Sequence, residues 1–211
     1  MSPTPPLDTL EPLIDAVREG IESAGWPMSG LQKTTSREFE GRWDGEDSRS
    51  AYLFFHRDDL PEGVAVEGFL DETSDGLRAN LSLVVDLPPL DRLGDARALL
   101  AGLSRVVGDC LPEDYRTPFS LRLSVAGPGA DPARAAVQAR LKLRVPAAAL
   151  RAGAGAVQAL AATTARAFER ALAHPELALL VREAAELAGG SGAGGVADDE
   201  EEGEGDGDGD V

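Results

Sequence analysis

The stretch that decides the fold is residues 64–85, VAVEGFLDETSDGLRANLSLVV. Its second half alternates apolar with polar residues from Leu77 to Val85, and a period of two places the apolar side chains on one face of a β-strand. In its first half Val64, Val66 and Leu70 also share one parity, and the polar segment between the halves contains Asp75-Gly76, a pair typical of tight turns. The stretch therefore predicts a β-hairpin with one face in a core and the other toward water.

Similar patterns predict further helices and strands on both sides of this hairpin. In the expected helices apolar residues recur every three or four positions, and in the expected strands they alternate with polar residues. The expected helices cover residues 7–24, 93–110 and 147–187, the last broken at His174-Pro175, and the expected strands cover residues 31–43, 51–56, 119–125 and 137–145. The sequence thus predicts an α+β domain in the order α-β-β-β-β-α-β-β-α, with an antiparallel sheet of five to six strands and helices packed on one face.

The pattern also places individual side chains within these elements. Thr9 is the expected N-cap of the first helix, because its hydroxyl can accept a backbone N–H there. Leu100 lies with Cys110 on the apolar stripe of the second helix. Leu123 and Val125 share the apolar parity of their strand. Leu100, Cys110, Leu123 and Val125 are therefore expected to face the core.

The charges are distributed unevenly along the chain. The 211 residues carry a formal net charge of −17, and nine carboxylates lie in residues 198–210, which leaves −8 for residues 1–197. The segment before these carboxylates is rich in glycine, and residues 1–6 are rich in proline. We therefore expect one folded domain, residues 7–187, between a disordered N-terminus and a Gly-rich linker with a disordered acidic tail, residues 188–211.

Composition argues against several classes of protein. A body of this charge disfavours general binding to nucleic acid or to an anionic membrane, since both depend on cationic protein surfaces. We recognise neither a signal peptide nor an apolar run of membrane-spanning length. The single cysteine, Cys110, excludes an intramolecular disulfide. A cytoplasmic protein is therefore expected.

No set of residues predicts catalysis or a metal site. His56-Arg57-Asp58 matches a short motif of protein kinases, but the other motifs of that fold are missing. The two histidines, His56 and His174, lie too far apart in sequence for a common metal-binding spacing. We therefore expect neither enzymatic activity nor a bound cofactor or metal ion.

One group of residues does predict a function. If the apolar parities of the strands face the helices, the opposite face of the sheet carries cations together with aromatic side chains. The candidate partner-binding residues on this face are Tyr52, Phe54, Arg78, Arg122, Arg140, Lys142 and Arg144. Such a surface suits the docking of an acidic or extended peptide. A solvated sheet face without a binding role is the alternative, because strands commonly place arginine and lysine toward water.

The predicted order of elements from Leu7 to Leu187 resembles the type III secretion chaperone-like fold, including a related bacterial family of sensory transduction regulators. The resemblance implies a small, acidic, cytoplasmic protein, often a homodimer, that binds protein partners without catalysis. We therefore expect a chaperone-like or regulatory module that holds a polypeptide partner on its sheet face or in its helix grooves. The alternative is a nucleic-acid-binding regulator whose basic sheet face is masked by the acidic tail.

The acidic tail suggests a further hypothesis. Opposite charges on a tether predict that the tail folds back transiently over the basic face and competes with the partner. Deleting the residues after Ala188 should then strengthen partner binding at low salt.

Overall fold

The structure, a computed structural model, describes residues 6–35 and 48–190. Its strands are β1 (Met28–Thr35), β2 (Arg49–Phe55), β3 (Val64–Thr73), β4 (Gly76–Leu87), β5 (Ser120–Ser124) and β6 (Ala136–Arg144). Its helices are α1 (Leu10–Ser23), α2 (Ala96–Cys110), α3 (Ala147–Ala152), α4 (Ala154–Ala173) and α5 (Pro175–Gly190), with short 3-10 helices η1 (Leu90–Arg92) and η2 (Pro132–Arg134).

The six strands form one antiparallel sheet in the order β1-β2-β3-β4-β6-β5. β3 and β4 are the predicted hairpin. Thr73 pairs with Gly76 beside the turn, and the φ angle of Gly76 is +112°, a conformation that favours glycine. After β4 the chain forms α2 and returns as β5 and β6, and β6 pairs with the remaining edge of β4. The predicted α+β class and order of elements are confirmed.

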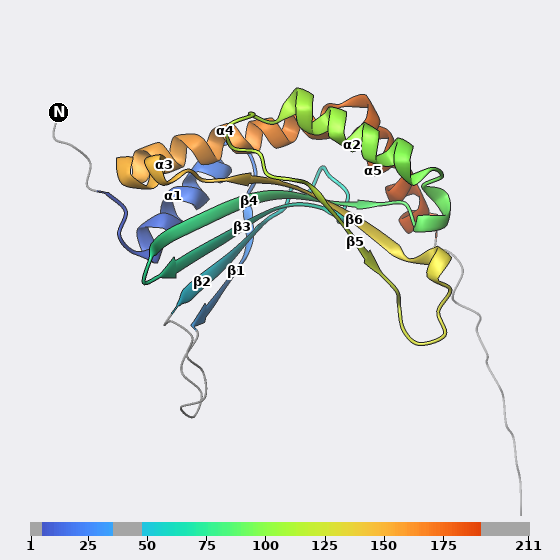
Figure 1. The fold of residues 1–211 in the computed structure, drawn as a ribbon, viewed down its shortest axis with the longest axis horizontal. Coiled ribbons are helices and arrows are strands. Elements are labelled where there is room, and N and C mark those ends of the chain that lie inside the picture. Colours follow the sequence, from blue (N-terminus) through green and yellow to red (C-terminus); the bar gives the residue numbers. More distant parts are fainter. Residues whose placement is uncertain (1–5, 36–47, 191–211) are drawn as a thin grey trace, which may run out of the picture.

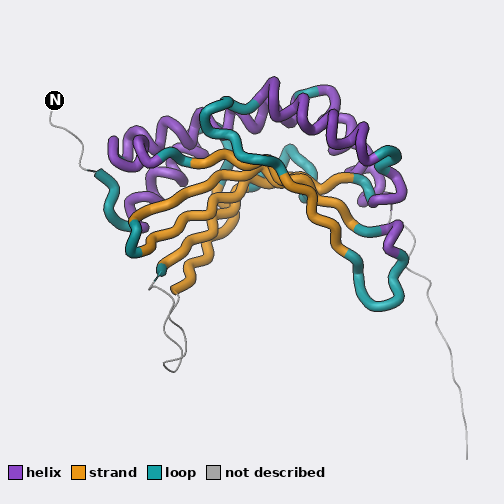
Figure 2. The backbone as a smooth tube through the Cα atoms, in the orientation of Figure 1, coloured by secondary structure: helices purple, strands orange, loops and turns teal. Residues whose placement is uncertain are grey.

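The five helices of the described chain lie on one side of the sheet (Figure 1). α1 packs against α4 and over β2 and β3, while α5 packs on β4. The sheet arches beneath the helices, and no other described element crosses its concave side (Figure 2). The sheet therefore has a covered face and an open face.

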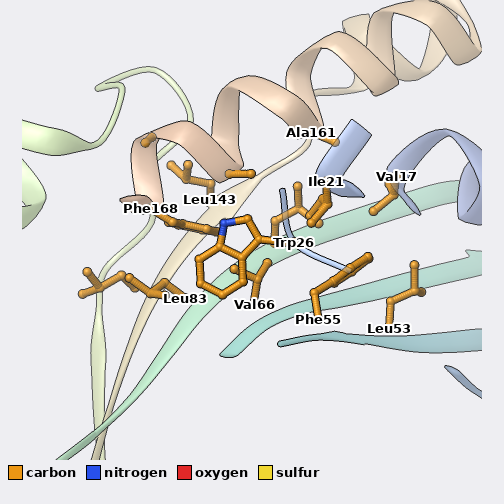
Figure 3. Close-up of a cluster of buried hydrophobic side chains, with 14 of the residues drawn as sticks. Val17, Ile21, Trp26, Leu53, Phe55, Val66, Leu83, Leu143, Ala161 and Phe168 are labelled. Atoms are coloured by element: carbon orange, nitrogen blue, oxygen red, sulfur yellow. The ribbon is translucent and has the colours of Figure 1, made fainter. Parts of the chain in front are cut away.

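The hydrophobic core lies between the helices and the covered face. Trp26, Phe55 and Phe168 are its largest fully buried side chains. Figure 3 shows the indole ring of Trp26 beside Phe168 of α4, with Val66 of β3 and Leu83 of β4 close to it. Burial of each large apolar side chain contributes about 1.5–3 kcal/mol to stability. This cluster therefore holds α4 to the middle of the sheet.

The start of α1 differs from the prediction. Thr9 occupies the N-cap position, but its side chain accepts no capping hydrogen bond. A carboxylate oxygen of Glu72, on β3, instead accepts the N–H of Leu10 at 2.7 Å, and Arg49 donates to the same oxygen at 2.6 Å. A carboxylate at a helix N-terminus also interacts favourably with the helix dipole. A residue distant in sequence thus replaces the predicted cap.

Three side chains predicted to face the core are exposed instead. Leu100 is 45% exposed, because α2 turns Leu103 and Val106 toward the core. Leu123 and Val125 are 57% and 49% exposed. Leu123 lies near the end of the edge strand β5, and Val125 follows that strand. The prediction for these three residues is therefore wrong.

The C-terminal helical region is divided more finely than predicted. His174-Pro175 ends α4, as expected, because proline disfavours a helical conformation in the residue before it. An additional break occurs at Gly153, whose φ angle is +95°, and separates α3 from α4. α5 continues to Gly190, so the predicted linker is helical over residues 188–190.

Parts of several predictions lie outside the described residues. These are the N-terminal residues 1–5, the predicted strand 31–43 beyond Thr35, and the acidic segment within residues 191–211. β1 begins at Met28 and forms the other edge of the sheet. In residues 6–35 and 48–190, no helix has the length and apolar character needed to cross a membrane.

Candidate functional site

Strand register places all seven candidate residues on the open face of the sheet. Alternate residues of β6 from Val137 to Leu143 are buried against the helices, so Arg140, Lys142 and Arg144 point away from them. Residues that pair directly across antiparallel strands share a face. By this register the same face carries Tyr52, Phe54, Arg78 and Arg122. The seven residues therefore share one surface, as their strand parities predict.

Two rows of paired residues cross the middle of the open face. Along β2, β3, β4 and β6, the successive partners in the first row are Tyr52, Phe69, Asn80 and Arg144. In the second row they are Phe54, Glu67, Ser82 and Lys142. The ring centroids of Tyr52 and Phe69 are 5.0 Å apart, with the rings tilted by 47°. Each row therefore begins at an aromatic side chain and ends at a cation.

Two neighbouring hollows lie along these rows. The aromatic hollow, of about 460 Å³, is lined by the side chains of Tyr52, Phe54, Glu67, Phe69, Asn80, Ser82, Arg140 and Lys142. The cationic hollow, of about 510 Å³, is lined by Arg78, Asn80, Lys142 and Arg144. It extends to the start of α3 over the apolar residues Leu77, Ala79, Val145, Ala147 and Leu150. Asn80 and Lys142 line both hollows. Six of the seven predicted residues therefore surround one continuous region of the open face.

Ion pairs divide the cations of this region into two kinds. Arg140 lies 2.8 Å from the carboxylate of Glu67, and Arg78 lies 3.0 Å from an aspartate in the hairpin turn. Lys142 and Arg144 have no ion-pair partner among the described residues. A carboxylate in contact with a guanidinium group cancels much of the positive charge that the guanidinium would present to a third, anionic group. Lys142 and Arg144 are therefore the cations best placed to bind an anionic group.

Arg122 lies apart from the other six residues. It pairs with Gln138 on β6, four residues from Lys142, a separation of about 13 Å at the usual strand spacing. With Arg92 and Arg134 it lines a different cavity, at the end of the sheet. The sequence thus grouped Arg122 on the correct face but with the wrong neighbours.

The residues of these sites that sequence reasoning missed include the aromatic Phe69 and the two arginines Arg92 and Arg134. Phe69 lines the aromatic hollow. The sequence sign that could have identified it is an aromatic residue among the polar, outward-facing positions of β3. Arg92 and Arg134 lie in the short 3-10 helices η1 and η2, next to Arg122 in space. Because irregular segments have no strand period, their side-chain directions could not be read from the sequence.

The kinase-like triplet takes part in a structural cluster. Arg57 donates to both carboxylate oxygens of Asp59, at 2.6 and 2.9 Å, and to Glu169 of α4 at 2.9 Å. Its guanidinium carbon lies 5.6 Å from the ring centroid of the buried Trp26. The hydrogen bonds between Arg57 and Asp59 lower the pKa of Asp59 and raise that of Arg57. The cluster ties the end of β2 to α4.

The described residues contain no group of three or more His, Cys, Asp or Glu side chains positioned to hold a metal ion.

Cys110 is buried at the end of α2, as the sequence predicted. Burial raises the pKa of its thiol, and the nearby carboxylate of Asp109 raises it further. We expect a disulfide reagent at pH 8 to react with the native protein at least tenfold more slowly than with the urea-unfolded protein, because the attacking species is the thiolate. The absorbance of the released thiol measures both rates. Equal rates would contradict the buried position of Cys110.

Comparison with protein-family models, with characterised proteins and with solved structures finds no match to this chain. The geometry and chemistry of the open face are therefore the basis for assigning a function.

Proposed function

We propose that the protein is a non-enzymatic binding module whose open sheet face holds an extended, acidic segment of a polypeptide partner. The observation that carries this proposal is the pair of rows that run from aromatic side chains to Lys142 and Arg144, which form no ion pair with any described residue. Aromatic rings offer large apolar contact area, and cations bind carboxylates through charge-assisted hydrogen bonds. The face therefore combines an apolar subsite with a cationic subsite that can bind a carboxylate.

The two hollows have dimensions suited to peptide side chains. Their volumes of about 460 and 510 Å³ lie within the usual range for ligand sites, about 300–1,000 Å³. Because Asn80 and Lys142 border both hollows, one extended chain can place nearby side chains in each, with a rise of about 3.3 Å per residue. An apolar side chain suits the aromatic hollow, and a carboxylate suits the cationic hollow.

The architecture suggests the kind of partner. The order of elements resembles type III secretion chaperone-like proteins, which hold polypeptide clients. On this basis we propose a chaperone-like or regulatory role in a bacterial cytoplasm, with assembly as a homodimer. Light scattering on the full chain tests the dimer, since a mass near the 22.0 kDa of one chain would contradict it.

A nucleic-acid-binding regulator is the competing function. Aromatic side chains beside cations on a sheet can stack on bases and bind phosphates. Here the carboxylates of Glu67 and Asp75 already contact two of the cations. The net charge of −8 over residues 1–197 also opposes the counterion release that drives binding to phosphates. These observations favour a polypeptide partner.

The double substitution Lys142→Glu/Arg144→Glu tests the proposal. The probe is a fluorescent peptide of about ten residues, roughly 33 Å long when extended. It has leucine at alternate positions of its first half and glutamate at the same alternate positions of its second half, so one face of the extended chain carries both kinds of side chain. We expect the double substitution to weaken its binding at least tenfold, because the two free cations become carboxylates that repel the probe. Fluorescence anisotropy on the full chain measures the affinity.

The matched control is Arg151→Glu/Arg166→Glu. These arginines are exposed on α3 and α4 and have no ion pair with any described residue. The control has the same net charge as the test variant, so it should reproduce only the general electrostatic effect. Equal weakening by both variants would rule out the open face as the peptide site. Tighter, steeply salt-dependent binding of a single-stranded oligonucleotide at Lys142 and Arg144 would favour the nucleic-acid function instead.

A further inference from the structure

A cavity of about 560 Å³ lies at the end of the sheet, apart from the two hollows. It is bordered by the end of β4, the start of β6, the edge strand β5 and the last turns of α5. Three arginines from three separate elements line it, which are Arg92 of η1, Arg122 of β5 and Arg134 of η2. We call it the arginine cavity.

Backbone contacts hold these arginines near one another. The N–H of Leu90 donates to the carbonyl oxygen of Ala135 at 3.0 Å, which joins η1 to η2. The side chain of Asp131 accepts the N–H of Ala133 at 2.9 Å and so caps η2. Arg122 is positioned by the pairing of β5 with β6. The cluster therefore follows from the fold and not from one flexible loop.

The arginines of the cavity carry charge that the described residues leave unpaired. Arg92, Arg122 and Arg134 are exposed, and none forms an ion pair within residues 6–35 and 48–190. Asp86 and Asp91 also line the cavity, and Asp86 accepts a hydrogen bond from Gln138 at 3.0 Å. Three guanidinium groups and two carboxylates leave a local excess of positive charge. The cavity is therefore suited to an anionic occupant.

The described chain ends beside this cavity. Ala184, Leu187 and Ala188 of α5 form one wall, and Figure 1 shows the end of α5 close to the segment between β5 and β6. Asp198 follows Gly190 by eight residues, which span at most about 29 Å when extended. Residues 198–210 contain nine carboxylates. A highly anionic segment is thus tethered at the wall of a cationic cavity.

We propose that the acidic segment 198–210 binds in the arginine cavity of its own chain. Arginine binds carboxylates through paired, charge-assisted hydrogen bonds, and nine carboxylates offer many registers for three guanidinium groups. A short tether raises the effective concentration of the segment to the millimolar range. The segment therefore shields this end of the sheet from anionic molecules in solution. This inference does not depend on the proposed function of the open face.

The test uses the full chain with its nine tail carboxylates changed to amides, which we call the neutral-tail variant. The probe is a fluorescent synthetic peptide with the sequence of residues 196–211. We expect the peptide to bind the neutral-tail variant at least tenfold more tightly than the unaltered protein, because the native segment competes for the same arginines. Binding should weaken as salt rises from low to physiological ionic strength.

Two further variants locate the peptide. In the neutral-tail background, Arg92→Gln/Arg122→Gln/Arg134→Gln should abolish the gain in affinity. The matched triple Arg97→Gln/Arg151→Gln/Arg166→Gln, at exposed helical arginines without described ion pairs, should retain it. Equal affinity of the unaltered and neutral-tail proteins would overturn the proposal.

Lys142→Glu/Arg144→Glu separates this site from the open face. In the neutral-tail background, at physiological ionic strength, it should leave binding of the tail peptide within about twofold of that background, since the distance of about 13 Å along β6 exceeds the screening length of about 8 Å. Loss of binding in this variant, with no loss in the cavity variant, would place the segment on the open face and overturn the assignment to the arginine cavity.

Discussion

Replacing Phe168 with alanine is expected to lower the free energy of unfolding by about 3–5 kcal/mol. The side chain is 0% exposed and lies beside Trp26 between α4 and the sheet (Figure 3). Alanine removes the ring and leaves a cavity, which closes only partly because α4 is also held by α1 and β4. Domains of ordinary stability unfold with about 5–15 kcal/mol, so the loss would be a large share of the total. Urea denaturation followed by circular dichroism measures it.

Leu123→Ala provides the matched control for this truncation. Leu123 is also a large apolar residue, but it is 57% exposed on the edge strand β5. Its truncation should change stability by no more than about 0.5 kcal/mol, as at most surface positions. A similar cost for both truncations would mean that α4 does not pack on the sheet as described.

Gly20→Ala is expected to destabilise the protein by about 1–3 kcal/mol, although alanine favours helices more than glycine does. Gly20 lies in α1 where that helix crosses α4. An added Cβ would overlap the backbone carbonyl oxygen of Gln158 and would lie 2.7 Å from the Cβ of Ala161. A backbone atom cannot move aside as a flexible side chain can, so the two helices must separate. Urea denaturation again gives the free energy.

Gly108→Ala is the comparison that isolates this effect. Gly108 is a helical glycine on the exposed side of α2, and no heavy atom lies within 4 Å of an added Cβ. There alanine should stabilise the protein by about 0.5–1 kcal/mol through its helix propensity. The two substitutions are thus expected to have opposite signs. Stabilisation by Gly20→Ala would contradict the close approach of α1 and α4.

Much of the open face could be predicted because strand periodicity is a local property. The parity of Lys142 and Arg144 follows from their apolar neighbours on β6. The strand that contains Tyr52 is apolar on both parities, and the burial of Ala51 and Leu53 in the structure shows that Tyr52 faces outward. The same rule failed for Leu123, because it gives the side of the sheet but not whether a helix covers that side. Coverage depends on where helices distant in sequence end.

The amino-acid pattern predicts the class of fold, the hairpin and the facing of residues in the cleanly alternating strands, because these follow from contacts and turn chemistry over a few residues. Which of those residues act together depends on the three-dimensional arrangement of the strands. The insertion of β6 beside β4 brings Arg140 to Glu67, whereas Lys142 and Arg144 meet no carboxylate within residues 6–35 and 48–190. Charge pairing depends on distances across strands, and strand order is set by the packing of the whole chain.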